Sequence, residues 1–377
     1  MAGIYIHIPF CKSRCSYCDF YSTTSENRKE RYIESLCKEI KFRKDYIINH
    51  PIETIYFGGG TPSQLDTDDF KSIFETISTY FDISKCREIT LEANPDDLTT
   101  QYIQELRTLP FNRISIGIQT FNNQLLKFLN RRHTDEQAIR AVQDCKNAGF
   151  KNISIDLMYG LPEETIQIWE TDLATAIELK VEHISAYHLI YEKGTLMDKM
   201  RRQQKIKEID EDLSLFFFKT MIEKLTEAGY VHYEISNFCK PDMYSIHNSS
   251  YWKGSHYLGC GASAHSYNGN SRQWNISSIK EYIQGIETNI PVIEKEELDL
   301  KTQYNDFVIT SLRTMWGLSL IELNNEFGKE LHDYCLKNAQ TYLTSGKMLI
   351  KNNTLYIHND GIFISDAIMS DLLFIEE

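Results

Sequence analysis

The sequence has 377 residues, of which 42% are hydrophobic and 25% are charged, so it can form two or three domains with sizeable cores. Its 53 acidic and 40 basic residues give a formal net charge of −13, which disfavours a general role in binding nucleic acid. No window approaches 18 uncharged apolar residues, and no basic segment followed by an apolar one opens the sequence. We therefore expect a cytoplasmic protein that meets membranes only through partners.

Short β-branched runs alternate with longer helical stretches in the first half of the chain. Strands separated by helices at this spacing are typical of parallel βα units. Six such strands favour an α/β fold with a partial (β/α)6 barrel, and an open doubly wound sheet is the alternative with the same periodicity. The expected strands are Ile4–Ile8, Thr54–Phe57, Glu88–Glu92, Arg113–Ile118, Asn152–Met158 and His183–Leu189, and the expected helices are Lys29–Ile47, Thr67–Tyr80, Thr100–Leu106, Asp135–Ala148 and Thr165–Leu179.

The second half of the chain has a different pattern. A helix is expected at Ile209–Ala228, followed by a segment rich in Tyr, His, Asn and Gly from Tyr230 to Asn275. The last third predicts a small α+β domain like a winged helix, with helices at Asn305–Met315, Ile321–Phe327 and Glu330–Ser345, strands at Lys347–Ile350 and Thr354–His358, and a final helix from Asp366. We expect a β/α barrel over 1–200, a connecting segment over 201–300 and the winged-helix-like domain over 301–377.

Three of the nine cysteines lie within eight residues, directly after the first expected strand. Cys11, Cys15 and Cys18 form a C-x3-C-x2-C pattern. Thiolates bind iron–sulfur clusters and zinc, but structural zinc usually has four ligands in paired knuckles. Three thiolates can hold three corners of a [4Fe–4S] cube and leave the fourth iron open for a bound reactant. The pattern therefore favours a cluster over zinc, and the six scattered cysteines are interpreted as buried thiols.

A glycine-rich turn, Gly58-Gly59-Gly60-Thr61-Pro62, follows the second expected strand. Glycines there allow the backbone to approach a ligand closely. The cysteine triplet and this turn, one βα unit apart, resemble the radical S-adenosylmethionine (SAM) superfamily. In that superfamily the three cysteines hold a [4Fe–4S] cluster, and SAM chelates the fourth iron. The resemblance implies both cofactors here, together with a one-electron reductant as a partner.

Longer stretches resemble the HemN/HemW family of that superfamily, which includes the oxygen-independent coproporphyrinogen III oxidases. They include the run from Tyr5 to Cys11, Leu91-Glu92-Ala93-Asn94-Pro95, and the run from Asp156 to Pro162. Their polar residues stand at or just beyond the ends of the expected strands, where β/α folds place active sites. The resemblance implies SAM contacts from Tyr5, Tyr17, Gly59, Gly60, Thr61, Glu92, Gln119, Arg131 and Asp156.

A second motif lies in the aromatic segment. His247-Asn248-Ser249-Ser250-Tyr251-Trp252 matches the H-N-x-x-Y-W motif of the haem-chaperone branch of the family. Imidazole is a common axial ligand of haem iron, and aromatic rings offer flat apolar area to a porphyrin. From spacing alone, an aromatic packing turn with a hydrogen-bonded histidine explains the motif better. The resemblance implies haem binding by His247, Tyr251 and Trp252.

The resemblance implies a haem chaperone that binds haem, the cluster and SAM. Its partners would be recipient haemoproteins such as respiratory cytochromes or haem-storage proteins, and a second copy in a homodimer. Oxidative decarboxylation of coproporphyrinogen III is one alternative. Phe20 stands where the oxidases have a fourth cysteine, and the chain has no extension before the first strand. Radical modification of RNA is the second alternative. The 6 basic and 10 acidic residues of 301–377 disfavour it, because an acidic domain is a poor partner for a phosphate backbone. Whether the chain is an enzyme stays open.

Overall fold

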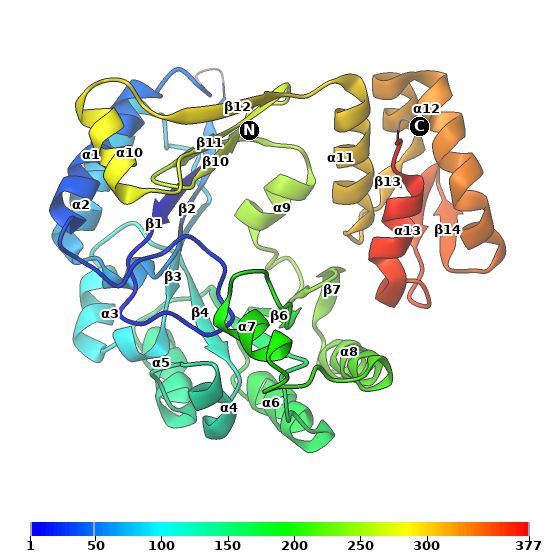
Figure 1. The fold of residues 1–377 in the computed structure, drawn as a ribbon, viewed down its shortest axis with the longest axis horizontal. Coiled ribbons are helices and arrows are strands. Elements are labelled where there is room, and N and C mark those ends of the chain that lie inside the picture. Colours follow the sequence, from blue (N-terminus) through cyan, green and yellow to red (C-terminus); the bar gives the residue numbers. More distant parts are fainter. Residues whose placement is uncertain (1, 48–49, 376–377) are drawn as a thin grey trace.

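Six parallel strands form the centre of a twelve-stranded sheet in the computed structural model, which describes residues 2–47 and 50–375 (Figure 1). Neighbouring strands follow one another in chain order, without the reversal of order that defines a doubly wound sheet. The predicted partial β/α barrel is therefore confirmed. These strands are β1 (Ala2–Ile8), β2 (Ile52–Gly59), β3 (Glu88–Ala93), β4 (Arg113–Gln119), β5 (Ile153–Tyr159) and β6 (His183–His188).

Helices cover the outer side of these strands (Figure 1). Capping boxes begin two of them, Asp66 with Asp69 before α2 and Thr134 with Gln137 before α5, which fixes where each helix starts. The helices predicted in the first half of the chain are confirmed to within two residues at each end, except the first, whereas the helix predicted at Asn305–Met315 spans Leu300–Leu312 because Asp299 caps its start. The helices are α1 (Lys29–Phe42), α2 (Thr67–Tyr80), α3 (Thr100–Leu106), α4 (Asn123–Phe128), α5 (Asp135–Asn147) and α6 (Ile166–Glu178).

The first helix ends at Phe42, so the prediction that it extends to Ile47 was wrong. The physical reason is Arg43, whose buried guanidinium donates to the Gly259 carbonyl at 2.9 Å and to Ser266 Oγ at 3.1 Å. These bonds fix the chain after α1 to strands more than 200 residues further on. A helical pattern in the sequence contains no information on such distant partners.

The segment between 201 and 300 supplies both edges of the sheet. On one side, β9 (His256–Cys260) runs parallel to β1 and is followed by β10 (His265–Tyr267), β11 (Ser271–Asn275) and β12 (Ile293–Glu297). On the other side, β8 (Asn237–Cys239) pairs antiparallel with β6, and β7 (Val231–Glu234) completes the sheet. The same segment holds α8 (Glu211–Glu227), α9 (Ile246–Trp252) and α10 (Ile279–Glu287), and α7 (Leu196–Arg202) ends at its start.

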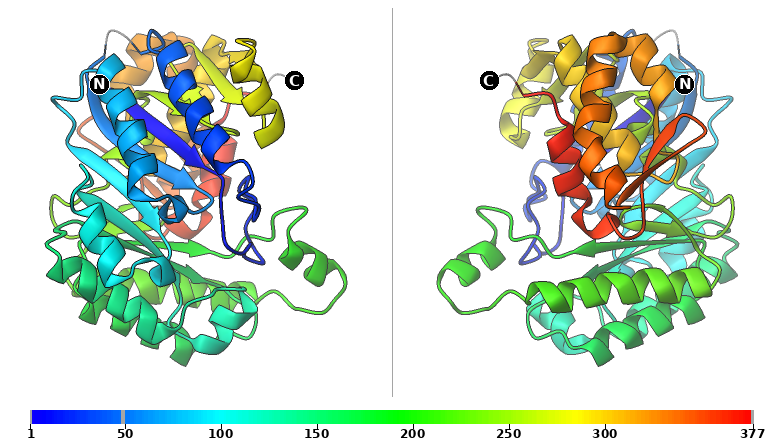
Figure 2. Two further views of the ribbon diagram at one scale, coloured as in Figure 1. Left: turned by 90° about the vertical axis from the view of Figure 1, so that its left-hand side faces the viewer. Right: turned by 90° about the vertical axis from the view of Figure 1, so that its right-hand side faces the viewer.

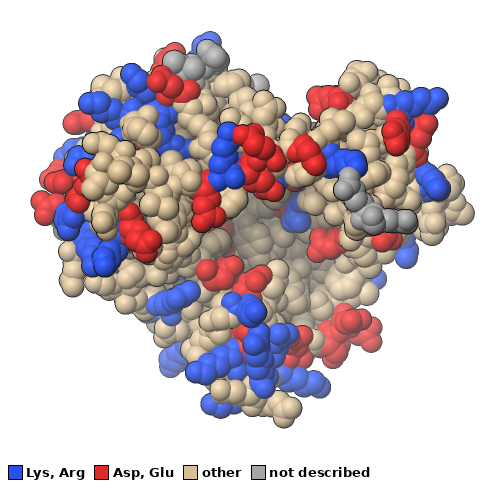
Figure 3. Space-filling view, turned by 45° about the horizontal axis from the view of Figure 1, so that its top comes forward, with Lys and Arg blue, Asp and Glu red and all other residues tan. Residues whose placement is uncertain are grey.

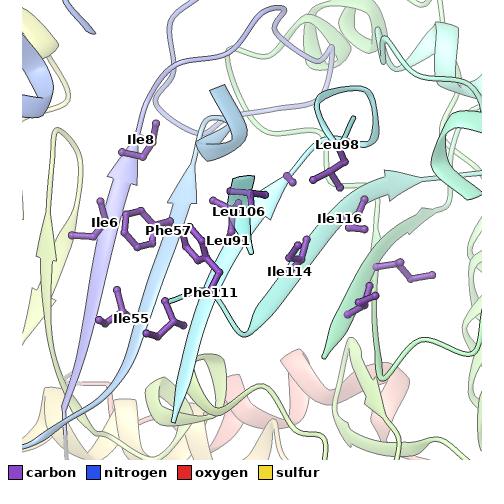
Figure 4. Packing of buried hydrophobic residues seen from close by; sticks show 14 of the residues in the cluster. Ile6, Ile8, Ile55, Phe57, Leu91, Leu98, Leu106, Phe111, Ile114 and Ile116 are labelled. Atoms are coloured by element: carbon purple, nitrogen blue, oxygen red, sulfur yellow. The ribbon is translucent and has the colours of Figure 1, made fainter. Parts of the chain in front are cut away.

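The main hydrophobic core lies between the parallel strands and their helices (Figure 4). Ile4, Ile6 and Ile8 alternate along β1 and are completely buried, as expected when one face of a strand meets the core. Phe57 and Phe111 pack edge to face, with ring centroids 5.4 Å apart. Full burial of each such side chain contributes about 1.5–3 kcal/mol, so this core holds the strand ends in fixed positions.

The C-terminal domain has its own core and a three-stranded sheet in the order β13-β15-β14. The long helix is kinked at Gly328, whose φ of 81° favours glycine, so it consists of two helices as the sequence predicts. The winged-helix-like order of elements is therefore confirmed. They are α11 (Leu300–Leu312), β13 (Leu318–Ser319), α12 (Leu320–Thr344), β14 (Met348–Lys351), β15 (Thr354–Ile357) and α13 (Ser365–Leu372).

Figure 2 shows the C-terminal domain in orange and red, and hydrogen bonds join this domain to the sheet edge at β7. Arg313 donates to the buried carboxylate of Glu234 at 2.9 Å, and the Met315 amide donates to the Tyr233 carbonyl at 2.9 Å. The proposed boundaries at residues 200 and 300 stay a prediction. Among the described residues, none of the helices has both the length and the apolar composition needed to span a membrane.

Candidate functional site

A cavity of about 430 Å³ lies at the C-terminal ends of the parallel strands, and we call it the strand-end cavity. Its wall contains eleven of the twelve residues predicted to hold the cluster or SAM. Tyr5 is the exception, because its side chain lines a different cavity. The eleven residues are Cys11, Cys15, Tyr17, Cys18, Gly59, Gly60, Thr61, Glu92, Gln119, Arg131 and Asp156.

The loop that carries the three cysteines is held in place by its neighbours. The Cys11 amide donates to the Thr23 carbonyl at 2.9 Å, which closes the base of the loop. The Ser16 amide donates to the Leu129 carbonyl at 3.1 Å, after α4. Lys12 forms a 2.7 Å ion pair with Asp97, whose side chain is 2% exposed. The loop therefore has fixed contacts with the segments that follow β3 and β4.

Two of the cysteine sulfurs accept hydrogen bonds from the cavity wall. Thr61 Oγ1 lies 3.3 Å from Cys11 Sγ, and Arg131 Nη1 lies 3.4 Å from Cys15 Sγ. Burial raises the pKa of the Cys11 thiol and raises that of Cys18 to about 11. Donors placed at sulfur atoms stabilise thiolates and tune the redox potential of a bound cluster.

Glu92 is the central acidic group of the cavity. Tyr56 Oη donates to one carboxylate oxygen at 2.7 Å, and the Gly59 amide donates to the other at 3.2 Å. Burial raises the pKa of Glu92 to about 7. The hydrogen bond from Tyr56 lowers this pKa, and the nearby negative charge of Asp156 raises it. Burial likewise raises the pKa of Asp156 to about 6. Both carboxyl groups therefore titrate near neutral pH.

Arg131 is the central basic group. Its guanidinium donates to Asn94 Oδ1 at 2.6 Å and to the Gly117 carbonyl, while its buried Nε has no partner within 2–47 and 50–375. Nearby, Gln119 has a φ of 74°, a conformation that few non-glycine residues adopt. The register of β4 with β5 shifts at the same place. A strained residue near a buried donor without a partner indicates that this wall of the strand-end cavity binds a ligand.

A second and larger cavity, of about 1150 Å³, lies between the sheet and the C-terminal domain, and we call it the aromatic cavity. Its walls come from β1 and β9–β11 on one side and from α11 and α12 on the other. Figure 3 shows a hollow between the C-terminal domain and the rest of the molecule, with Asp and Glu side chains on its rim. The aromatic lining residues are Tyr5, Phe20, Tyr21, Tyr251, Trp252, Tyr257, Tyr267, Phe307, Trp316 and Phe327.

The predicted haem residues do not all reach this cavity. Tyr251 and Trp252 line it, whereas His247 lies behind the wall with 1% of its surface exposed. Its Nδ1 is 2.7 Å from Thr54 Oγ1, and its Nε2 is 2.8 Å from Tyr251 Oη. Burial lowers the pKa of His247 to about 3, so the ring is neutral. Direct contact of His247 with haem stays a prediction, and this geometry does not provide a free ring nitrogen for it.

Comparison with known proteins places the chain in a family. Residues 5–175 match the radical SAM superfamily. The heme chaperone HemW of Lactococcus lactis is 37% identical over 324 residues, which cover 86% of this chain and 84% of that protein. The heme chaperone HemW of Bacillus subtilis is 30% identical over 376 residues, which cover 99% of both chains. The chain belongs to the HemW family.

The fold has a close counterpart among solved structures. Coproporphyrinogen III oxidase (HemN) from Escherichia coli, a radical SAM enzyme, superimposes with a TM-score of 0.86. The match covers 99% of this chain and 90% of the oxidase at 23% sequence identity. At that identity the likeness concerns the fold alone.

Membership of the HemW family and the radical SAM superfamily implies a [4Fe–4S] cluster and SAM, and the strand-end cavity fits both. It offers three thiols, a buried Arg131 Nε without a partner, and a cradle at Gly60. A Cβ atom at Gly60 would lie 2.9 Å from the Ile8 carbonyl oxygen and 3.0 Å from Cys11 Sγ. No group of three or more His, Cys, Asp or Glu side chains among the described residues is placed to hold a single metal ion. The cysteines of a cube bind different irons, so they need not converge on one point.

Several wall residues of the HemW-family site were missed in the sequence. Tyr56 lies two residues before the glycine-rich turn and donates a hydrogen bond to Glu92, and Asn94 links Arg131 to Thr61 at 2.6 and 3.3 Å. Both belong to stretches that the sequence already marks, so their position just before or after a predicted wall residue was the available signal. Asn248 lines the strand-end cavity, while Tyr251 of the same helix lines the aromatic cavity. Nothing in the sequence predicts that this one helix contributes residues to both cavities.

Proposed function

We propose that this chain is a haem chaperone, which binds haem and delivers it to haem proteins. The observation that carries the proposal is the placement of Tyr251 and Trp252 on the wall of the aromatic cavity. Ligand cavities for organic molecules have volumes of about 300–1,000 Å³, and a cavity of about 1150 Å³ has room for a porphyrin. The names of the HemW relatives state that activity for those proteins.

The strand-end cavity is the proposed site of the cluster and SAM. Cys11, Cys15 and Cys18 would hold the cluster, which supplies a one-electron redox centre with an open iron site. The carboxylate of Glu92 would accept hydrogen bonds from SAM, and Arg131 would donate from its unpartnered Nε. The remaining predicted SAM residues line the same wall, apart from Tyr5. Tyr5 stacks on Tyr56 with ring centroids 6.2 Å apart, so any effect of Tyr5 on SAM would pass through that ring.

The aromatic cavity is the proposed site of haem. Haem is a flat, mainly apolar molecule with an iron ion that takes axial ligands. The cavity offers ten aromatic rings and two cationic side chains, Lys253 and Arg272, which suit the propionate groups. Phe20 lines both cavities, so bound haem would touch the loop that carries the cysteines. The proposal includes delivery to respiratory cytochromes or haem-storage proteins, a one-electron reductant and a homodimer.

Haem titration tests the proposal. We would reconstitute the cluster anaerobically, titrate haem into the protein and follow the Soret absorbance. We expect stoichiometric binding that weakens about tenfold in Trp252→Ala, because an interface aromatic is lost, and is unchanged in Phe42→Ala. Phe42 is an exposed aromatic residue outside both cavities.

Transfer of bound haem to an apo-cytochrome completes the test, since a chaperone must release its cargo. If the wild type binds no haem, the proposal fails. Conversion of coproporphyrinogen III to protoporphyrinogen would instead support oxidase activity, which the fold match allows and which the absence of a cysteine at Phe20 disfavours.

A further inference from the structure

The aromatic cavity is lined by two histidines, and imidazole is a common ligand of haem iron. Proteins ligate this iron through His, Cys, Met or Tyr. Among the described residues that line the cavity, none is a cysteine or a methionine, and the histidines are His7 and His265. The choice of an imidazole ligand therefore lies between these two, with His247 of the motif as a third candidate behind the wall.

His7 has no nitrogen to offer. Its Nδ1 is 3.2 Å from Tyr5 Oη, and its Nε2 is 3.0 Å from the Tyr21 carbonyl oxygen. The side chain is also 4% exposed. His247 is in the same situation, with both nitrogens bonded inside the protein. Either ring could bind an iron ion only by giving up the hydrogen bond of one ring nitrogen and moving within a packed interior.

His265 differs from His7 and His247 both in exposure and in hydrogen bonding. It begins β10, its side chain is exposed into the cavity, and neither ring nitrogen is hydrogen-bonded within the described residues. The ring stacks on Trp274 of β11, at a centroid distance of 5.7 Å and an angle of 23°. Trp274 Nε1 in turn donates to Glu294 at 2.9 Å. The imidazole is therefore held in one plane by a fixed neighbour and has both nitrogens available.

We propose that haem binds in the aromatic cavity with its iron on His265, and that His247 is a positioning residue. This inference rests on the proposed haem-chaperone function. The hydrogen bond between Tyr251 Oη and His247 Nε2 holds the Tyr251 ring at the cavity wall, and Tyr56 stacks on His247 with ring centroids 4.9 Å apart. Glu88 accepts the backbone amides of Ile246 and His247 at 2.8 and 2.9 Å, which fixes the start of α9.

Arg272 lies at the other end of the same strand pair. In the β10–β11 register His265 pairs with Trp274, and Tyr267 pairs with Arg272, so the imidazole and the guanidinium stand on one wall. Iron on His265 would thus leave Arg272 free to meet a propionate at the other end of the macrocycle. Arg272 already pairs with Asp306 across the cavity, on α11, and its remaining donors can still bind a carboxylate.

The test compares four variants with the wild type in the full-length, cluster-reconstituted protein. Haem is titrated by Soret absorbance, and iron ligation is read by electron paramagnetic resonance and resonance Raman spectroscopy. His265→Ala should lose the histidine-ligated spectrum and weaken binding at least about tenfold. Added imidazole should restore that spectrum in His265→Gly. His332→Ala, in a histidine of α12 outside the cavity, should behave as the wild type.

His247→Gln separates the two roles, because an amide can replace the hydrogen bonds but is a poor iron ligand. We expect it to keep the spectrum of histidine-ligated iron, with affinity reduced by less than about fivefold. A wild-type spectrum in His265→Ala together with its loss in His247→Gln would overturn the inference and leave the chaperone function standing. Absence of haem binding in the wild type would overturn the proposed function itself.

Discussion

The two cavities differ in how the chain builds them. The strand-end cavity is made by residues in and just after consecutive parallel strands, and its polar groups bond to one another, as Tyr56, Glu92 and Gly59 do. The aromatic cavity is made by side chains of the sheet region on one side and of the C-terminal domain on the other, and its walls are flat rings with few mutual hydrogen bonds. The first is suited to fix a small polar ligand in one orientation, and the second to accept a flat apolar one.

This difference has a consequence for binding and release. Hydrogen bonds to charged groups have strict geometry and discriminate strongly between ligands. Contacts between aromatic faces tolerate sliding, and a cavity between two domains can open when the domains separate. We therefore expect a ligand of the strand-end cavity to be retained and a ligand of the aromatic cavity to be exchanged. The predictions below test whether the two cavities can be disabled independently.

The largest effect is expected from Cys15→Ser. Removal of one of three thiolates should abolish the cluster, seen as loss of bound iron and sulfide and of the absorbance near 400 nm. Haem affinity should change less than about twofold, because Cys15 does not line the aromatic cavity. Cys37→Ser is the matched control, in a half-buried cysteine outside both cavities. Loss of haem binding in Cys15→Ser would show that the cavities are one functional unit.

Glu92→Gln should give the next largest effect. A carboxylate with a pKa of about 7 gains its charge as the pH rises through neutrality, so the affinity for SAM should increase from pH 6 to pH 8. Loss of a hydrogen bond to a charged group costs about 1.5–3 kcal/mol, which predicts about 10–100-fold weaker binding at pH 8. Calorimetric titration of SAM into the wild type and into Glu92→Gln from pH 6 to pH 8 measures both affinities. Because SAM itself titrates equally in the two experiments, the difference between the two pH profiles reports on Glu92. Parallel pH profiles would contradict this role of Glu92.

The smallest effect is expected from Phe20→Ala, and it concerns both cavities. The Phe20 side chain is 63% exposed and lines both, so its removal should weaken haem and SAM binding by about two- to fivefold each. Parallel titrations of the two ligands measure this. An effect on one ligand only would show that Phe20 belongs to a single cavity in the loaded protein.

Much of the strand-end cavity could be predicted because parallel strands place the residues after them at one edge. Glu92 and Gln119 lie near or at the ends of β3 and β4, Asp156 lies in the middle of β5, and the structure brings all three together. Tyr5 lies in the middle of β1, as Asp156 does in β5, but it lines the aromatic cavity, so the position along a strand does not by itself decide which cavity a residue lines. The aromatic stretch that precedes Cys11 therefore predicts a wall, but of the other cavity.

The aromatic cavity could not be predicted beyond its motif. His265 belongs to a three-residue strand whose pattern is too short to be recognised, and its position depends on pairing with β9 and β11. The opposite wall, from Phe307 to Phe327, comes from α11, α12 and the residues between them, where the sequence shows no ligand motif. Only the packing of the second domain on the first brings these residues together.

Strand β1 has a consequence for the order in which the molecule is completed on the ribosome. It pairs with β2 on one side and with β9, near residue 260, on the other. At roughly 5–20 residues per second, the roughly 250 residues between β1 and β9 take roughly 12–50 s to synthesise. During this time one edge of β1 has no partner strand, and a protease added to ribosome-bound chains arrested before β9 should cut them faster than longer ones. Because α9 and the histidine-bearing strand β10 also emerge in this late segment, a nascent chain has no place for haem until most of its synthesis is over.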